Sequence, residues 1–261
     1  MKRFEGKTAI VTGGASGIGR KTAIMFASEG ANVVIATSTI VDRAQELAEQ
    51  IKREYGVGAL GLRCDVRVEA DVEAMVKAAV DAFGGIDFAF NNAGVGPDGV
   101  TIPLSPLTEV TEHDWDWVMD VDCKGVFLCM KHELRVMRDQ GFGCIVNTAS
   151  TAGMKAMPGF GAYGPAKAGL IQLTKAAACE NRDAGIRCNV VCPGPTSGTG
   201  MFERMFVQSR KDAPEPGDGD APPMDFRKPE DVAQVVLWLC SEESRYVNGN
   251  VVTADGGMDI I

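Results

Sequence analysis

Residues 8–19 read TAIVTGGASGIG, an apolar, β-branched run that leads directly into a cluster of glycines. The run predicts a buried strand, and a helix is expected to follow through Lys21–Ser28. Gly13, Gly17 and Gly19 permit a tight turn and a close approach of a ligand to the backbone. Because free amides and the helix dipole attract phosphate groups, the stretch predicts a dinucleotide-binding turn. The same glycines also suit a plain strand-to-helix connection, since their Gly-x-x-x-Gly-x-Gly spacing is not the usual Gly-x-Gly-x-x-Gly.

Strand and helix signals alternate along nearly the whole chain. Short apolar or β-branched runs predict strands at Thr8–Val11, Val33–Ile35, Ala59–Leu62, Ile86–Phe90, Cys144–Val146, Arg187–Val191 and Asn250–Thr253. Longer segments with helical spacing lie between them, such as Ala44–Tyr55, Glu69–Phe83 and Pro229–Cys240. This alternation predicts βαβ units with right-handed crossovers. The expected fold class is α/β, a single Rossmann-like, doubly wound domain over residues 1–261 with a parallel sheet of about seven strands.

Composition and charge exclude several classes of partner. Apolar residues make up 45% of the 261-residue chain and charged residues 23%, as in a soluble globular protein with a sizeable core. The formal net charge of −9 argues against nucleic acid and anionic membranes, because both would repel the chain. The sequence has neither an apolar signal segment nor a membrane-spanning run, so we expect a cytoplasmic protein.

Eight cysteines invite a disulfide or metal interpretation, yet most lie inside apolar strand or helix patterns. Cys188 and Cys192 are separated by three residues, and only His113 and His132 could join cysteines as ligands. We therefore expect buried, reduced thiols and no metal site.

Two connections are longer than a compact fold requires. The first covers Val95–Thr111, and the second covers residues 195–228 with an apolar patch at Met201–Val207. Both follow predicted strands, so both should leave the sheet at its carboxyl edge, where ligands of such folds bind. We expect the second connection to be either a substrate lid or a plain surface loop.

The residues after the second predicted strand bear on the choice of dinucleotide. Enzymes that use NAD commonly place an acidic residue there to bind the ribose hydroxyls. Here the strand continues into Thr37 and Ser38, and the first carboxylate is Asp42. Hydroxyl groups donate hydrogen bonds to a 2′-phosphate, which favours NADP over NAD, although no arginine or lysine follows directly. Asp65, after the third strand, is placed to accept a hydrogen bond from adenine or simply to form a turn.

Ser150, Tyr163 and Lys167 form the candidate catalytic set. Residues four apart share one face of a helix, so the Lys167 ammonium should lie beside the Tyr163 phenol. A nearby positive charge favours the phenolate and lowers the pKa of the tyrosine toward the operating range. Such a phenol exchanges a proton with an alcohol or ketone oxygen, to which Ser150 would hydrogen-bond. A Tyr and a Lys at this spacing also occur by chance, so the pair indicates a catalytic site only together with other motifs of the chain.

Further motifs follow in one chain order, and with them nearly the whole chain resembles the short-chain dehydrogenase/reductase family. The matching segments are Thr12–Gly19, Asn91–Gly94, Ser150, Tyr163, Lys167, Pro193–Gly194 and Asp255–Gly257. The resemblance implies Tyr163 as acid/base, Ser150 as the residue that positions the substrate carbonyl, and Lys167 on the nicotinamide ribose. Hydride would move between NADP or NAD and the carbonyl carbon, and some NADP-dependent reductases of the family carry a similar Ala-Thr-Ser after the second strand. The expected cofactor contacts are Gly13, Ser16, Gly17, Ile18, Gly19, Thr37, Ser38, Asp65, Val66, Asn92, Ala93, Gly94, Tyr163, Lys167, Pro193, Gly194 and Thr196.

Asp122 departs from the family pattern, which has an asparagine at this position that supports a water between the active-site lysine and solvent. Aspartate is nearly isosteric but adds negative charge near Lys167. We expect either a proton relay with altered pH dependence or simple tolerance, if the relay uses the backbone carbonyl. Gly198 also stands where the family often has threonine, with Thr199 next, so the nicotinamide contacts of this loop stay open.

Apolar residues on segments beside the expected site suggest the nature of the substrate. They are Met154, Met157, Pro158, Phe160, Met201, Phe202, Met205 and Phe206. Methionine gives an adaptable apolar wall, so we expect a hydrophobic cyclic, aromatic or steroid-like secondary alcohol, such as a hydroxysteroid, or its ketone.

Two alternatives remain open. One is reduction of a 3-oxoacyl thioester. An acidic carrier protein would bind best to a basic surface patch, and the negative net charge of the chain disfavours such a patch. The other is a non-catalytic nicotinamide-binding sensor or scaffold. The resemblance also implies a homotetramer or homodimer, formed through a helix over Thr111–Arg138 and the helix that bears Tyr163.

Overall fold

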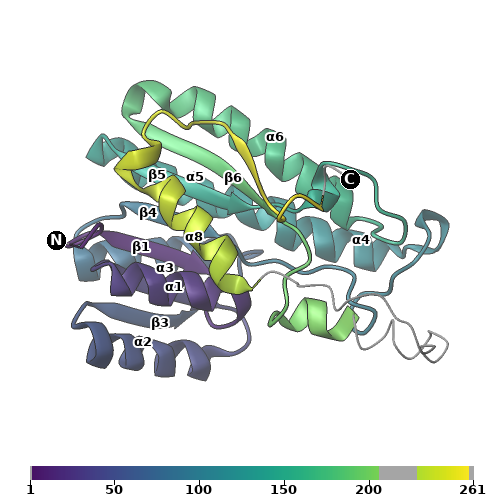
Figure 1. Ribbon diagram of the computed structural model, residues 1–261, viewed down its shortest axis with the longest axis horizontal. Helices are drawn as coiled ribbons and strands as arrows, with labels where there is room; N and C mark the ends of the chain where they lie inside the picture. The colour runs from purple at the N-terminus through teal and green to yellow at the C-terminus, as the bar shows by residue number, and fades with distance from the viewer. Residues whose placement is uncertain (1, 206–227, 259–261) are drawn as a thin grey trace.

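The computed structural model describes residues 2–205 and 228–258 (Figure 1). One seven-stranded parallel sheet runs through it, in the order β3-β2-β1-β4-β5-β6-β7. The strands are β1 (Thr8–Thr12), β2 (Asn32–Thr37), β3 (Ala59–Arg63), β4 (Phe88–Asn91), β5 (Gly143–Thr148), β6 (Ile186–Pro193) and β7 (Val251–Ala254). The winding reverses between β1 and β4, which makes their carboxyl ends the switch point of the sheet. The predicted α/β class and the seven strands are confirmed.

Helices cover both faces of the sheet (Figure 1). Side chains alternate between two cores along β1, because Ile10 packs in one core while Ala9 and Val11 pack in the other. The core that holds Ile10 includes residues of α3 (Glu69–Phe83), α5 (Gly125–Gln140) and α6 (Tyr163–Asn181). The opposite core includes residues of α1 (Gly17–Ser28), α2 (Val41–Tyr55) and α8 (Pro229–Cys240). Burial on both faces explains why the strands read as continuous apolar runs.

The prediction of one continuous helix over Thr111–Arg138 is wrong. The segment Thr111–Arg138 was expected as a single helix, but it consists of α4 (Glu112–Met119), the π-helical turn η2 (Asp120–Lys124) and α5. A π-turn carries a wider hydrogen-bonded ring and re-aims the side chains on it, often at functional sites. Asp122 lies in the middle of this turn, and its side chain is fully buried.

The two long connections leave the carboxyl edge of the sheet, as predicted. The first follows β4 and includes the short turn η1 (Leu107–Glu109), and the second follows β6 and becomes helical at residues 200–205. Of the predicted lid at residues 195–228, the part at 206–227 lies outside the described residues, as does Phe206. Within residues 2–205 and 228–258, no helix combines the length and the apolar character needed to cross a membrane.

A polar network is buried between the sheet and α5. Asn91 Nδ2 donates to Glu133 Oε2 at 2.9 Å and to Asn147 Oδ1 at 3.0 Å, and Asn147 Nδ2 donates to Thr174 Oγ1 at 2.9 Å. Among the described residues, Glu133 Oε1 and Asn91 Oδ1 find no hydrogen-bond partner. Burial raises the pKa of Glu133 to about 7, and the hydrogen bond from Asn91 offsets this only in part. A proton on Glu133 would give this network of acceptors one further donor.

This network makes stability depend on pH. The pKa of Glu133 is raised in the folded chain from 4.5 to about 7, so the folded state binds the proton more tightly than the unfolded state. The free energy of unfolding should therefore fall as pH rises from 4.5 through about 7. Glu133→Gln keeps the shape and a donor without the charge, and we expect it to stabilise the protein by roughly 3 kcal/mol at pH 8, and by less at pH 5. Denaturant unfolding at both pH values measures this, and equal stability of the two proteins at pH 8 would contradict the raised pKa of Glu133.

Candidate functional site

The carboxyl ends of β1, β4, β5 and β6 surround one cavity of about 680 Å³. It extends from the glycine turn after β1, past the first residues of α6, to the connection after β6. Predicted site residues that line it are Gly13, Ser16, Gly17, Ile18, Asn92, Ala93, Gly94, Ser150, Tyr163, Lys167, Pro193, Gly194 and Thr196. Predicted site residues outside its lining are Gly19, Thr37, Ser38, Asp65, Val66 and Asp122. Spacing and the family resemblance together therefore identified 13 of the residues that line the cavity.

The glycine turn fits the pyrophosphate of a dinucleotide. Gly13 and Gly17 have φ angles of +63° and +50°, in the left-handed region that favours glycine. A Cβ on Gly19 would lie 2.4 Å from the carbonyl oxygen of Gly13, so the turn closes only without that side chain. Ser16 begins α1 without a side-chain cap, and the first turn of α1 holds no acidic residue. The amides at this helix end are thus free for an anion, and their dipole favours one.

A short brace fixes the turn against the neighbouring strand. Thr12 Oγ1 accepts from the backbone amides of Asn92 at 3.0 Å and Ala93 at 3.1 Å. Asn92 Nδ2 donates to the Thr12 carbonyl at 3.2 Å. These bonds join β1 to β4 where the winding reverses, so the predicted Asn92 segment is held at the floor of the cavity.

Tyr163 and Lys167 face each other on the first turns of α6. Tyr163 is the first residue of this helix, and the Lys167 ammonium lies 5.5 Å from the centroid of its ring. Ser150 precedes the short turn η3 (Thr151–Gly153), and its Oγ accepts from the amide of Ala152 at 3.2 Å. A Cβ on Gly153 would lie 2.8 Å from the Lys167 backbone, so η3 packs closely on α6 and keeps Ser150 beside Tyr163.

The Lys167 ammonium is held by two oxygen atoms below the cavity. Asp122 Oδ1 lies 3.1 Å away, and the Thr148 carbonyl accepts from Nζ at 2.9 Å. The exposed fractions of the Lys167 and Asp122 side chains are 3% and 0%. The backbone amide of Val95 donates to both carboxylate oxygens, at 3.2 and 3.3 Å, which fixes Asp122 in place. The expected negative charge beside Lys167 is therefore present as a buried ion pair.

Burial and mutual charge interactions shift the pKa values of Asp122, Lys167 and Tyr163. Burial raises the pKa of Asp122 to about 6 against the opposing attraction of Lys167. Burial works against the charge of Lys167, but Asp122 and Tyr163 outweigh it and raise the pKa of the ammonium. Burial likewise raises the pKa of Tyr163, with Lys167 lowering it and Asp122 raising it again. The expectation that Lys167 lowers the pKa of Tyr163 is right for that contact and wrong for the net shift, because burial dominates.

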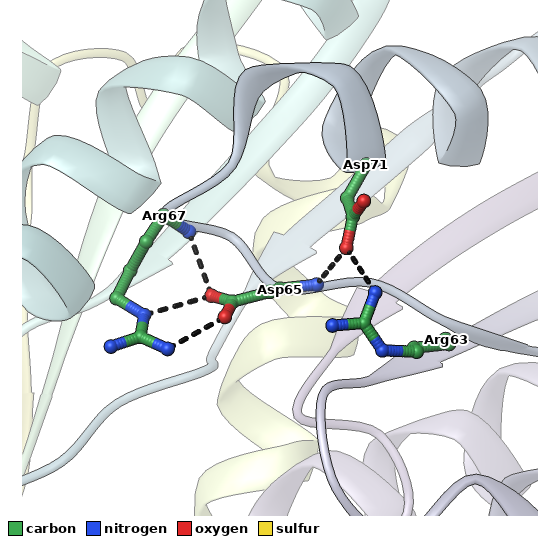
Figure 2. Close-up of polar contacts among 4 residues, drawn as sticks. All are labelled: Arg63, Asp65, Arg67 and Asp71. Carbon is green, nitrogen blue, oxygen red and sulfur yellow. Dashed lines mark hydrogen bonds and ion pairs between the residues drawn. The ribbon is translucent and has the colours of Figure 1, made fainter.

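Figure 2 shows two ion pairs at the carboxyl end of β3. Asp65 accepts from Arg67 Nε at 3.0 Å and from Arg67 Nη2 at 2.7 Å, so its carboxylate is largely committed to that arginine. Arg63 ends β3 and binds Asp71 at 2.7 Å, and it lies in register with Thr37 of β2. A cation beside Thr37 was not predicted, because Arg63 is 26 positions away in the chain and only strand pairing joins the two residues.

The far end of the cavity is mostly apolar. Five of the predicted apolar residues line it, namely Met157, Phe160, Met201, Phe202 and Met205. Met154 and Pro158 do not, and the side chain of Met154 points into solvent with half its surface exposed. Sequence reasoning missed Ile102, Asp98 and Arg204, which also belong to the wall. Asp98 lies in the long connection Val95–Thr111 and Arg204 lies in the patch Met201–Val207, but nothing in the sequence pairs these two residues.

Comparison with known proteins agrees with this geometry. A family model described as enoyl-(acyl carrier protein) reductase matches residues 13–259. The chain is 39% identical, over all of both chains, to 2,5-dichloro-2,5-cyclohexadiene-1,4-diol dehydrogenase of Sphingobium indicum. It is 36% identical to the 3-oxoacyl-(acyl-carrier-protein) reductase of Aquifex aeolicus, with 98% of each chain covered. The crystal structure of levodione reductase superimposes with a TM-score of 0.88 at 33% identity, covering 99% of both chains.

Proposed function

The chain belongs to the short-chain dehydrogenase/reductase family, and we propose that it interconverts a small cyclic secondary alcohol and its ketone with a nicotinamide dinucleotide. One observation carries this proposal: a buried ammonium, a phenol and a serine meet in the cavity that also contains the glycine turn. A protein that only sensed the dinucleotide would not need these three side chains in register. The relatives are oxidoreductases, so the sensor alternative is set aside.

Tyr163 is the proposed acid/base. Its hydroxyl donates a proton to the carbonyl oxygen in reduction, and the phenolate takes the proton back in oxidation. The dinucleotide, when bound, supplies or accepts the hydride. The Ser150 Oγ accepts from the amide of Ala152 and makes a side-chain hydrogen bond with Tyr163, so a substrate oxygen that reaches the phenol also lies within reach of the serine hydroxyl. The pKa of Tyr163 is raised, chiefly by burial, so near neutral pH the phenol is in the protonated form that can donate to a carbonyl oxygen.

NADP is the cofactor that we infer, within a family that uses both nicotinamide dinucleotides. The carboxyl end of β2 places Thr37 and the exposed Ser38 where adenosine ribose binds in such folds, and neither repels a 2′-phosphate. Arg63 stands in register with Thr37, and 58% of its side chain is exposed. Its pairing with Asp71 leaves further N–H groups to donate. Asp65 would accept from adenine only in competition with Arg67.

The substrate that fits best is a compact ring. The cavity of about 680 Å³ must hold the reactive end of the dinucleotide as well as the substrate, and this leaves less room for the predicted steroid-like compounds than for a single ring. One relative is named for a cyclohexadiene diol, which supports a six-membered ring. Pro195, Thr196 and most residues from Thr199 to Met205 line the cavity, and a lid role for residues 195–228 is part of this proposal. A homotetramer or homodimer in the cytoplasm stays a prediction.

Reduction of a 3-oxoacyl thioester is the second candidate. The Aquifex aeolicus relative carries that name and matches nearly the full chain. The net charge of −9 disfavours docking of an acidic carrier protein, so we rank this activity below ring reduction.

Turnover assays test the proposal directly. The purified enzyme should oxidise NADPH faster than NADH in the presence of cyclohexanone-type ketones, and faster than with a 3-oxoacyl thioester. Tyr163→Phe should lower kcat by at least about a hundredfold and leave dinucleotide binding intact, because it removes only the transferable proton. Tyr246→Phe is the matched control, since that side chain is 92% exposed. Full activity of Tyr163→Phe would exclude the proposed acid/base.

Asp122 is proposed as a positioning residue that acts through Lys167. Its carboxylate holds the ammonium, and its charge raises the pKa of Lys167 and of Tyr163. Replacement by asparagine preserves an acceptor for Lys167 but removes that charge. The phenol then becomes a stronger acid, so the phenolate forms at lower pH.

The Asp122→Asn variant should therefore shift the pH profile of alcohol oxidation toward acid and raise the rate near neutral pH several-fold. Asp120→Asn provides the control, because it removes the same charge from the same turn at an exposed site paired with Lys124. The profiles of kcat/KM against pH for the three proteins give the answer. Coincident profiles for Asp122→Asn and the wild type would leave Asp122 without a role in proton transfer.

A further inference from the structure

One ion pair joins the two long connections across the mouth of the cavity. Arg204 Nε, on the helical segment 200–205, donates to Asp98 Oδ2 at 2.6 Å. Both side chains line the cavity, but the Asp98 side chain is 2% exposed and the Arg204 side chain is 46% exposed. Among the described lining residues, Arg204 and Lys167 are the two cations, and Lys167 is committed to Asp122 below.

Asp98 is a rigid anchor for this arginine. Its Oδ1 accepts from the backbone amides of Val100, Thr101 and Ile102 at 2.9, 2.6 and 3.2 Å. Burial would raise the pKa of Asp98, but these amides and Arg204 outweigh it and lower the pKa. The carboxylate is therefore ionised near neutral pH, and it engages one of the five N–H groups of Arg204 through Nε. The N–H groups on the two terminal nitrogens are left for another acceptor.

The position of Arg204 relative to Tyr163 follows from the glycine between them. A Cβ on Gly96 would lie 3.0 Å from the Tyr163 ring and 3.2 Å from the sulfur of Met201, so Met201 is beside the phenol. Arg204 comes three residues after Met201 on the same helical segment, and therefore one turn away on the same side. A helical turn is about 5.4 Å long, comparable to a six-membered ring with its substituents.

Building on the proposed function, we propose that Arg204 determines specificity by donating hydrogen bonds to a second oxygen of the ring, at the end opposite the carbon that reacts at Tyr163. Methionine and phenylalanine side chains make up much of this end of the cavity, so a hydrogen-bond donor there would select among ring substrates. Asp98 neutralises the arginine, and the pair therefore suits a neutral carbonyl or hydroxyl oxygen better than a carboxylate. The substrate class is a six-membered ring that carries oxygens on opposite carbons.

Cyclohexane-1,4-dione and cyclohexanone test this inference, because they differ only in the second oxygen. The wild type should have a kcat/KM for the dione well above twice that for the monoketone, the factor of two reflecting its two equivalent carbonyls. Arg204→Met keeps the length and apolar stem, and should lower kcat/KM for the dione by about tenfold or more. Its kcat/KM for cyclohexanone should stay within about threefold of the wild type, and Arg204→Lys should restore part of the preference.

The Asp98→Asn variant distinguishes recognition of the second ring oxygen from a purely structural link between the two long connections. It removes the charge of the anchor but leaves the arginine donors, so it should affect both ketones alike and retain the preference for the dione. Equal losses for both ketones in Arg204→Met would mean that the ion pair only fastens the two connections, and would overturn the inference. A wild-type ratio of about two would overturn it as well. Turnover of neither ketone by a wild type that binds the dinucleotide would instead contradict the proposed function on which the inference rests.

Discussion

The ion pair between Lys167 and Asp122 is the constraint on which the site depends. The ammonium and the carboxylate are almost fully buried, and such a pair persists only when its geometry is good and its remaining donors and acceptors are satisfied. The Thr148 carbonyl and the Val95 amide supply those partners. The π-turn at Asp120–Lys124 places Asp122 beneath Lys167. An irregular turn between α4 and α5 thus positions a candidate catalytic side chain of α6.

The parallel sheet brings the other parts to the same place. Winding reverses between β1 and β4, and the chain leaves the sheet there through the glycine turn and the Asn92 segment. Two internal ion pairs, Lys167 with Asp122 and Arg204 with Asp98, leave the cavity nearly neutral within a chain of net charge −9. A neutral, mostly apolar cavity around one polarised phenol suits an uncharged alcohol or ketone.

Local patterns in the sequence predicted what depends on local order. Short apolar runs predicted all seven strands, because a strand that is buried on both faces has a continuous apolar sequence. The bounds of α3 and α8 also agree with the predicted ones. The spacing of Tyr163 and Lys167 likewise fixed their contact through the helix period. Features that depend on pairing of distant segments stayed hidden. Arg204 reaches Asp98 across 106 positions, Arg63 meets Thr37 only through strand register, and the π-turn has no composition of its own. The net shift of the Tyr163 pKa was also missed, since it is a balance between burial and two opposite charges.

The central claim is that the Lys167 charge tunes the phenol of Tyr163. The chain has only three tyrosines, so labelling them isotopically at the ζ carbon gives resolvable NMR signals. The most direct measurement is the titration of Tyr163 in the Asp122→Asn variant and in the same variant with Lys167→Met, which removes the ammonium without leaving an unpaired carboxylate. Loss of the ammonium should move the titration midpoint of Tyr163 to higher pH, because the lysine charge favours the phenolate. Identical midpoints in the two proteins would contradict the account.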